Sequence, residues 1–186
     1  RTIEGWGGGA LTPGGRLLLA CNPDREVSAW EVATGKMLWK SAGYPALADF
    51  FGISPDGKRF VTNDGGTGRA VYPVKPKRIQ RTLSGHSGRI KVGAFNPDGS
   101  LLATGGDHSP GGDNRVLLWD TATGERVRTI ETPSHRVAAL AFCNPGNHVA
   151  VGSTSDEALL YDAAAGELVH RFPGHSATVR MAVSGD

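Results

Sequence analysis

Cysteine is scarce in this sequence, and long hydrophobic runs are missing from it. Cys21 and Cys143 are the only two cysteines, whereas a small disulfide-stabilised scaffold requires more. Both follow apolar runs, so we expect two reduced, buried thiols. No run of about 18 apolar residues occurs, so we expect no membrane-spanning helix.

An excess of charge of one sign is also missing. Twenty basic and 18 acidic side chains leave a formal charge of +2. Binding to nucleic acid or to a membrane surface relies on a concentrated basic field. The most basic stretch, residues 72–81, contains a single aromatic residue, Tyr72, although single-stranded nucleic acid requires several stacking platforms. The composition therefore makes nucleic acid an unlikely ligand and gives no indication of membrane binding.

Glycine, in contrast, is abundant and supplies 27 of the 186 residues, about twice its usual share. Many of these glycines lie in turns that recur along the chain, and proline marks one such turn in each of four repeats. The four prolines are separated by 42, 42 and 48 residues: Pro13, Pro55, Pro97 and Pro145. Repeats of this length indicate a fold assembled from similar units.

An aromatic residue at the end of an apolar run provides a second marker with the same period. These residues are Trp30, Tyr72, Trp119 and Tyr161. Runs of five to seven Val-, Leu- and aromatic-rich residues bounded by Gly, Pro, Asn and Asp indicate short strands. Four strands in about 42 residues predict one blade of a β-propeller. The sequence is therefore predicted to be all-β.

At Gly85–Glu125 the sequence resembles a WD40 repeat. It has the Gly85-His86 start, the turn at Pro97-Asp98-Gly99, and the Trp119-Asp120 pair at the end of an apolar run. The resemblance implies a β-propeller of four-stranded antiparallel blades. We place four full WD40 blades at about residues 5–42, 43–84, 85–131 and 132–173, and the first strand of a partial fifth blade at 174–186.

WD40 propellers are closed rings, most often of seven blades, which take roughly 300 residues. Each repeat relies on its neighbours to bury its core. Three arrangements remain open for the 186 residues: a segment of a longer chain whose further blades complete the ring, self-association, and a compact four-bladed ring.

The resemblance also assigns a structural role to His86, Thr104, Asp113 and Trp119. These four match the hydrogen-bonded tetrad of the family, in which a His bridges an Asp and a hydroxyl that reaches the Trp N–H. A His, a Thr and an Asp also suggest a hydrolase. The serine of a nucleophile elbow is absent, however, so we expect a structural network and no catalytic residue.

Two further sets of residues are candidates for contact with a partner. Asp107 and His108 lie in an inserted loop, residues 106–112, and loops on rigid scaffolds often carry function. They are too few to predict a metal site. Arg89 and Arg136 share one repeat position, which in the family faces the entrance of the central channel. Because the arginine fork pairs with carboxylates, these two suit an acidic or phosphorylated peptide. The alternative is that both are solvated surface arginines.

The sequence thus predicts a non-catalytic scaffold or adaptor that binds proteins or peptides on the propeller face, without a cofactor or metal. Two alternatives remain: a propeller enzyme of the hydrolase or lyase type, and a binder of nucleic acid or of a phosphorylated ligand.

Overall fold

The computed structural model describes residues 9–22, 24, 26–41, 50–63, 69–74, 81–106, 114–133, 136–143, 147–153 and 157–174. In these ranges the chain forms sixteen strands, one short 3-10 turn at Pro13–Gly15, and no α-helix. The prediction of an all-β fold with antiparallel four-stranded blades is confirmed.

Each sheet is a meander in which consecutive strands pair antiparallel. The first sheet contains β1 (Gly9–Leu11), β2 (Leu17–Cys21), β3 (Val27–Glu31) and β4 (Lys36–Ser41). The second contains β5 (Phe50–Ile53), β6 (Arg59–Asn63), β7 (Arg69–Pro73) and β8 (Arg81–Leu83). The third contains β9 (Ile90–Phe95), β10 (Leu101–Gly106), β11 (Arg115–Asp120) and β12 (Arg126–Glu131). The fourth contains β13 (Val137–Cys143), β14 (His148–Ser153), β15 (Glu157–Asp162) and β16 (Leu168–Pro173).

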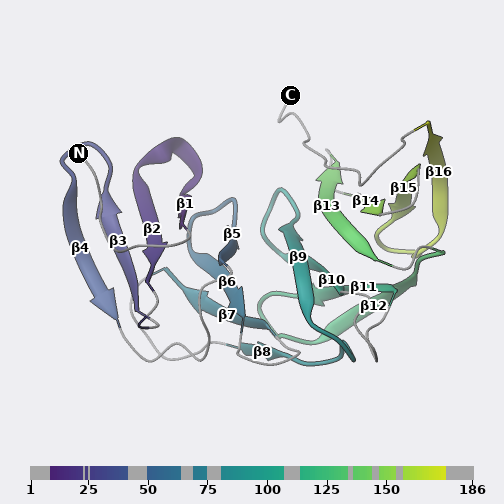
Figure 1. The fold of residues 1–186 in the computed structure, drawn as a ribbon, viewed down its shortest axis with the longest axis horizontal. Coiled ribbons are helices and arrows are strands. Elements are labelled where there is room, and N and C mark those ends of the chain that lie inside the picture. Colours follow the sequence, from purple (N-terminus) through teal and green to yellow (C-terminus); the bar gives the residue numbers. More distant parts are fainter. Residues whose placement is uncertain are drawn as a thin grey trace.

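The four sheets follow one another along an open arc (Figure 1). The first strand of each sheet lies on the inner side of the arc, and the inner strands contact one another in order: β1 with β5, β5 with β9, and β9 with β13. The first and fourth sheets stand at the two ends of the arc, which is open between them (Figure 1).

The recurring glycine turns are explained by backbone geometry. In the first, third and fourth sheets the register shifts by one residue just before the aromatic marker, at Trp30, Trp119 and Tyr161. The following turn ends on a glycine with positive φ, which L side chains rarely adopt. In the third sheet this is Gly124, at φ 77°. The Asp120 carboxylate supports the same turn by accepting hydrogen bonds from the N–H groups of Ala122 (2.8 Å) and Thr123 (2.7 Å).

The inner turns repeat a second local device. In the first three sheets, the side chain of the residue before the turn proline accepts a hydrogen bond from the N–H five residues later. These bonds run from Leu17 to Thr12 Oγ1 (3.0 Å), from Arg59 to Ser54 Oγ (2.9 Å) and from Leu101 to Asn96 Oδ1 (2.8 Å). Thr, Ser and Asn are therefore interchangeable at this position, because each offers an oxygen acceptor one or two atoms beyond Cβ.

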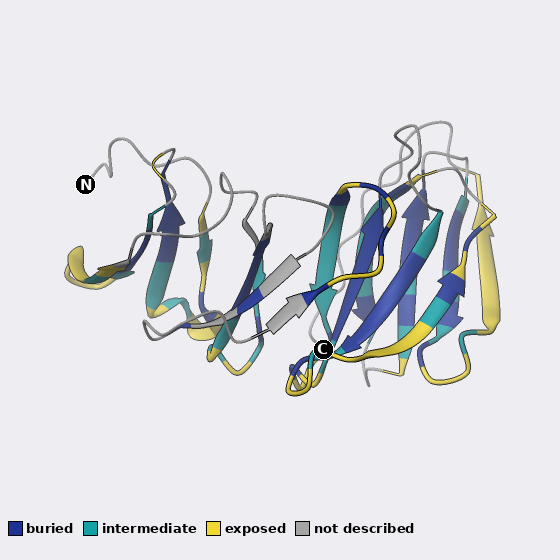
Figure 2. Cartoon of the chain, turned by 90° about the horizontal axis from the view of Figure 1, so that it is seen from below, coloured by how far each residue is buried: buried dark blue, intermediate teal, exposed yellow. Residues whose placement is uncertain are grey.

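The hydrophobic core lies between the sheets. One cluster joins the first and second sheets, for example Leu19 to Phe60, and a second joins the second and third, for example Val61 to Trp119. The largest joins the third and fourth, for example Leu118 to Val149. Figure 2 shows the buried residues on the central strands and the exposed ones along β16. Each sheet thus buries its apolar side chains against a neighbouring sheet.

The third and fourth sheets approach most closely at Gly105. A Cβ atom at this position would lie 2.5 Å from Val137 Cγ1 and 2.9 Å from Val92 Cγ2, far closer than packed carbon atoms allow. The missing side chain lets the start of β13 rest on the backbone of β10. Gly105 therefore sets the distance between the two sheets.

Both cysteines are free thiols. Cys21 is buried between the first two sheets, as expected, and burial raises the pKa of its thiol to about 11. Cys143 is only half-buried, so the expectation of two buried thiols is wrong for this residue. It ends β13, at the edge of the cluster that buries the strand interior.

A methyl group at Gly105 should destabilise the fold. We expect Gly105→Ala to lower the unfolding free energy by about 1–3 kcal/mol, the usual range for overpacking, because Val137 and Val92 cannot both move away. Gly93→Ala is the matched control, since its new Cβ would meet the Ala103 carbonyl oxygen at 3.3 Å. Denaturant unfolding measures both, and equal stabilities for the two variants would contradict this account of the sheet spacing.

Candidate functional site

Three side chains of the third sheet form a buried hydrogen-bonded network centred on one hydroxyl group. His86 Nε2 lies 2.9 Å from Thr104 Oγ1, and Trp119 Nε1–H donates to the same oxygen at 2.7 Å. All three side chains are at least 95% buried. One atom, Thr104 Oγ1, thereby connects the segment before β9, the middle of β10 and the end of β11.

Proton counting indicates how the network is arranged. The Thr104 hydroxyl has one proton and two acceptors within reach, His86 Nε2 at 2.9 Å and the Leu117 carbonyl oxygen at 3.4 Å. The shorter distance favours donation to His86, which makes Nε2 the acceptor and puts the imidazole proton on Nδ1. The resemblance to a WD40 repeat predicts that this Nδ1–H donates to Asp113, which lies outside the described residues.

Gly85 allows the indole ring to sit in this position. A Cβ at Gly85 would lie 3.2 Å from Trp119 Cη2 and 3.3 Å from Leu117 Cδ1. Trp119 cannot give way easily, because its Nε1–H is fixed to Thr104. The Gly85-His86 pair therefore combines a close approach to the ring with a hydrogen bond to the hydroxyl that the ring contacts.

In the first sheet the tryptophan N–H has a different hydrogen-bond acceptor, which the sequence analysis missed. Trp30 pairs with Leu18 in the register, as Trp119 pairs with Leu102. The position of Thr104 is then occupied by Ala20, which has no hydroxyl. Trp30 Nε1–H donates instead to Ser28 Oγ at 2.6 Å. The sequence signal for this hydrogen bond is a serine two residues before the tryptophan. It can be interpreted only once the pairing register of β2 and β3 is known.

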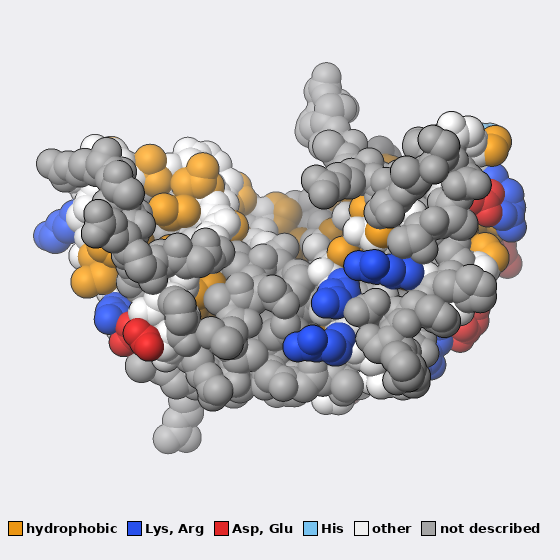
Figure 3. All heavy atoms as spheres, viewed as in Figure 1, with side chains coloured by type: hydrophobic (Ala, Val, Ile, Leu, Met, Phe, Trp, Pro, Cys, Tyr) orange, Lys and Arg blue, Asp and Glu red, His pale blue; other side chains and the backbone are white. Residues whose placement is uncertain are grey.

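Two of the four candidate partner-binding residues are described, and both lie at the starts of inner strands. Arg89 precedes β9 and Arg136 precedes β13, and both side chains are exposed. These strands lie side by side, with Val137 and Val92 both against Gly105. Figure 3 shows Lys and Arg side chains gathered on this part of the molecule, with no acidic side chain among them in that view. We call this surface, where β9 and β13 begin and Arg89 and Arg136 are exposed, the basic face. The other two candidates, Asp107 and His108, lie outside the described residues.

Among the described residues, no three His, Cys, Asp or Glu side chains gather in a way that could hold a metal ion. No helix in that part of the chain is long and apolar enough to span a membrane. The network around Thr104 is buried, and its hydroxyl is engaged with His86 and Trp119.

Comparison with known proteins gives a match to one repeat. Residues 77–120 match the family described as "WD domain, G-beta repeat". This range begins before β8, the outer strand of the second sheet, and ends with β11. The sequence repeat is therefore offset from the sheet, so that one repeat contributes strands to two sheets.

Several curated proteins are similar over longer stretches. The chain is 32% identical to "Protein tipD" of Dictyostelium discoideum over 54% of its length, and 32% identical to "Small ribosomal subunit protein RACK1" of Glycine max over 58%. It is 29% identical to "Angio-associated migratory cell protein" of Homo sapiens over 91% of its length. The matches cover 16%, 31% and 42% of those proteins, so the chain spans less than half of each.

Removing the imidazole of His86 should loosen the third sheet. We expect His86→Ala to lower the unfolding free energy by about 1–3 kcal/mol, because Thr104 loses a buried partner. For a chain of this length each kcal/mol corresponds to roughly 2–4 °C in the melting temperature. Thermal melting followed by circular dichroism measures the change. His170→Ala is the control, because that ring is exposed and contacts Phe172. An unchanged midpoint for His86→Ala would contradict a structural role.

Proposed function

We propose that this chain, which matches the WD-repeat family over residues 77–120, is a non-catalytic scaffold that binds acidic protein or peptide segments on its basic face. The observation that carries the proposal is the pair Arg89 and Arg136. Both are exposed and stand at the same point of neighbouring sheets.

The rigid placement of the two arginines supports this ligand class. Each follows a loop but immediately precedes a buried first strand residue, Ile90 or Val137. Strands hold side chains in place better than loops do. Two guanidinium groups next to the starts of adjacent strands can each pair with a carboxylate of one extended segment. Such charge pairing mainly increases the association rate and the specificity.

The same features favour binding over catalysis. The one His–hydroxyl pair that the described residues bring together, His86 with Thr104, is buried and engaged with Trp119. A nucleophile must face its substrate and a base. We therefore propose that partners use the surface of the arc, while its polar interior maintains the fold.

Reversal of charge on the basic face tests the proposed function. We expect a fluorescein-labelled hepta-glutamate peptide to bind the protein, and its affinity to fall at least about tenfold in Arg89→Glu/Arg136→Glu, since two charge-assisted contacts become repulsive. Fluorescence anisotropy at low and physiological salt measures the affinity. Lys36→Glu/Lys58→Glu is the charge-matched control, because both lysines are exposed, Lys36 at the start of β4 and Lys58 in the turn after β5. Equal affinity of the double variant and the control would contradict the proposal.

We also propose that a further sheet covers each end of the arc, from the same chain or from a second copy. Ile130 and Phe172 occupy equivalent register positions, opposite Val116 and Ala158. Ile130 is 1% exposed because the fourth sheet covers it, whereas Phe172 is 45% exposed. At the other end, Leu11 is 56% exposed and its equivalent Phe142 is 7% exposed.

A charge introduced at position 172 tests whether a further sheet covers this face in the natural protein. We expect Phe172→Glu to destabilise the native protein by several kcal/mol, on the order of the penalty for burying an unpaired carboxylate. Leu168→Glu is the control, because the equivalent residue of the third sheet is already charged, Arg126. Equal melting temperatures of the two variants would show that this face is open to water.

A further inference from the structure

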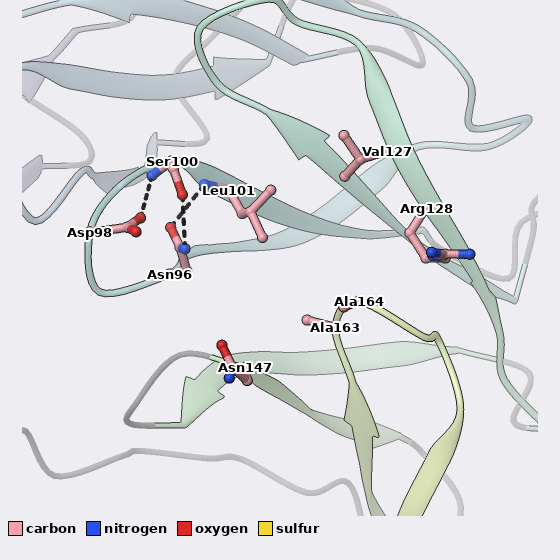
Figure 4. Close-up of a pocket in the computed structure, with 9 residues that line it drawn as sticks. All are labelled: Asn96, Asp98, Ser100, Leu101, Val127, Arg128, Asn147, Ala163 and Ala164. Atoms are coloured by element: carbon pink, nitrogen blue, oxygen red, sulfur yellow. Dashed lines mark hydrogen bonds between the residues drawn. The ribbon is translucent and has the colours of Figure 1, made fainter.

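A cleft lies between the third and fourth sheets, on the face opposite the basic face. Its volume is about 440 Å³, and it is bounded by the β9–β10 turn, by β12 and by the β15–β16 turn (Figure 4). Strand β9 runs from Ile90 to Phe95, so the turn that follows it is at the far end from Arg89. We call this hollow the inter-sheet cleft.

The cleft exists because two side chains are shorter here than at the preceding junction. Arg59 in β6 occupies the register position of Leu101 in β10, as the pairs Phe60 with Tyr72 and Leu102 with Trp119 show. The pKa of Asp120 in the third sheet lies below its usual range, first because Thr123 N–H donates to it, and also because the charge of Arg59 lies nearby. Arg59 therefore reaches from the second sheet toward the third, and Leu101 cannot reach as far.

The second of the shorter side chains lies across the cleft, in the fourth sheet. Thr121 of the third sheet is buried and donates to the Gly99 carbonyl oxygen at 2.7 Å. Its equivalent in the fourth sheet is Ala163, whose N–H bonds to Asn147 just as Thr121 N–H bonds to Ser100. Alanine leaves the space of the hydroxyl unfilled. The cleft is thus a consequence of sequence differences between repeats whose backbones are alike.

The lining combines aliphatic and polar side chains. Leu101, Val127 and Ala164 supply aliphatic surface, and Val127 is 49% exposed. Asn147 stands at one side of the cleft with its amide group, apart from Asp98 and Ser100 on the β9–β10 turn (Figure 4). A side-chain amide can donate to and accept from the backbone of an extended peptide. Such a combination suits a short aliphatic side chain on a strand-like segment.

The cleft carries a negative charge on Asp98. Hydrogen bonds from Ser100 hold the pKa of the Asp98 carboxyl below its usual range, so this group is ionised at neutral pH. Among the described residues, no Lys or Arg forms an ion pair with it. Arg128, the cation of the lining, packs its stem against Gly166. Its charge lies near Asp162, whose pKa is lowered first by Ala165 N–H and also by Arg128.

We infer that the inter-sheet cleft is a second protein-binding site, which takes an extended peptide segment with an aliphatic residue next to a lysine or arginine. The aliphatic side chain covers Leu101 and Val127, and the cation pairs with Asp98. The inference goes beyond the proposed scaffold function, because the site lies on the other face and selects the opposite charge. A scaffold with these two sites can hold an acidic and a basic segment at the same time.

The test uses two capped peptides, acetyl-Gly-Val-Lys-Gly-amide and acetyl-Gly-Val-Glu-Gly-amide, with backbone amide NMR spectra of the protein. We expect the lysine peptide to shift the signals of Val127 and Ala164 saturably at concentrations up to roughly 10 mM, where weak sites are detected. Asp98→Asn should weaken this binding about two- to fivefold, the range of an exposed ion pair. Leu101→Arg, which restores the residue type of the preceding junction, should abolish it.

Controls separate this site from the basic face. Ala164→Gln narrows the cleft from an exposed turn and replaces Leu101→Arg if that variant fails to fold. Arg89→Glu/Arg136→Glu should leave binding of the lysine peptide unchanged. The inference is overturned if the lysine peptide causes no saturable shift, if the glutamate peptide shifts the same signals equally, or if neither cleft-filling variant reduces binding. None of these results bears on the binding of hepta-glutamate to the basic face.

Discussion

Packing of one sheet against the next is the interaction on which this structure depends. A four-stranded meander has two faces and cannot cover either of them by itself. Here each junction is closed by a cluster drawn from both sheets, and at Gly105 the approach is so close that no side chain fits. The bulges, the glycine turns and the Thr104 network keep each sheet in the shape that this packing requires. Where the series of sheets ends, equivalent residues such as Phe172 are left exposed.

Because of this packing, interior side chains maintain the fold and surface side chains form the candidate binding sites. Side chains that maintain the junctions are committed to the core, including the polar His86, Thr104 and Trp119. At the ends of the strands and in the turns the backbone hydrogen bonds are local, so the side chains beside the turn glycines and prolines can differ from repeat to repeat. Repetition then places variable residues at fixed spacing around the arc. Two arginines at equivalent positions create one candidate surface, and two shortened side chains create the inter-sheet cleft.

Much of the fold could be predicted from the sequence, because its signals are local. The turn prolines, the aromatic markers and the glycines report on backbone geometry within a few residues, and they predicted short strands and turns in repeats of about 42 residues. The resemblance to a WD40 repeat implied the antiparallel four-stranded sheets. The proximity of His86, Thr104 and Trp119 followed from resemblance to a repeat that aligns them. The Ser28–Trp30 hydrogen bond and the cleft beside Leu101 were not predicted. Both depend on which residues face one another across strands or sheets, and this register is not visible in a linear pattern. Asp113, Asp107 and His108 lie outside the described residues, so their roles remain predictions.

Native-state hydrogen exchange on the monomeric 186-residue chain tests most directly whether neighbouring sheets provide the stability. The third sheet is covered on both faces and the fourth on one, although their strands pair in the same register. The account predicts that amides of β10 and β11 exchange more slowly than the equivalent amides of β14 and β15, because opening requires the loss of two junctions. Equal protection of the two pairs of strands would contradict it, and would mean that each sheet is stabilised mainly by its own hydrogen bonds.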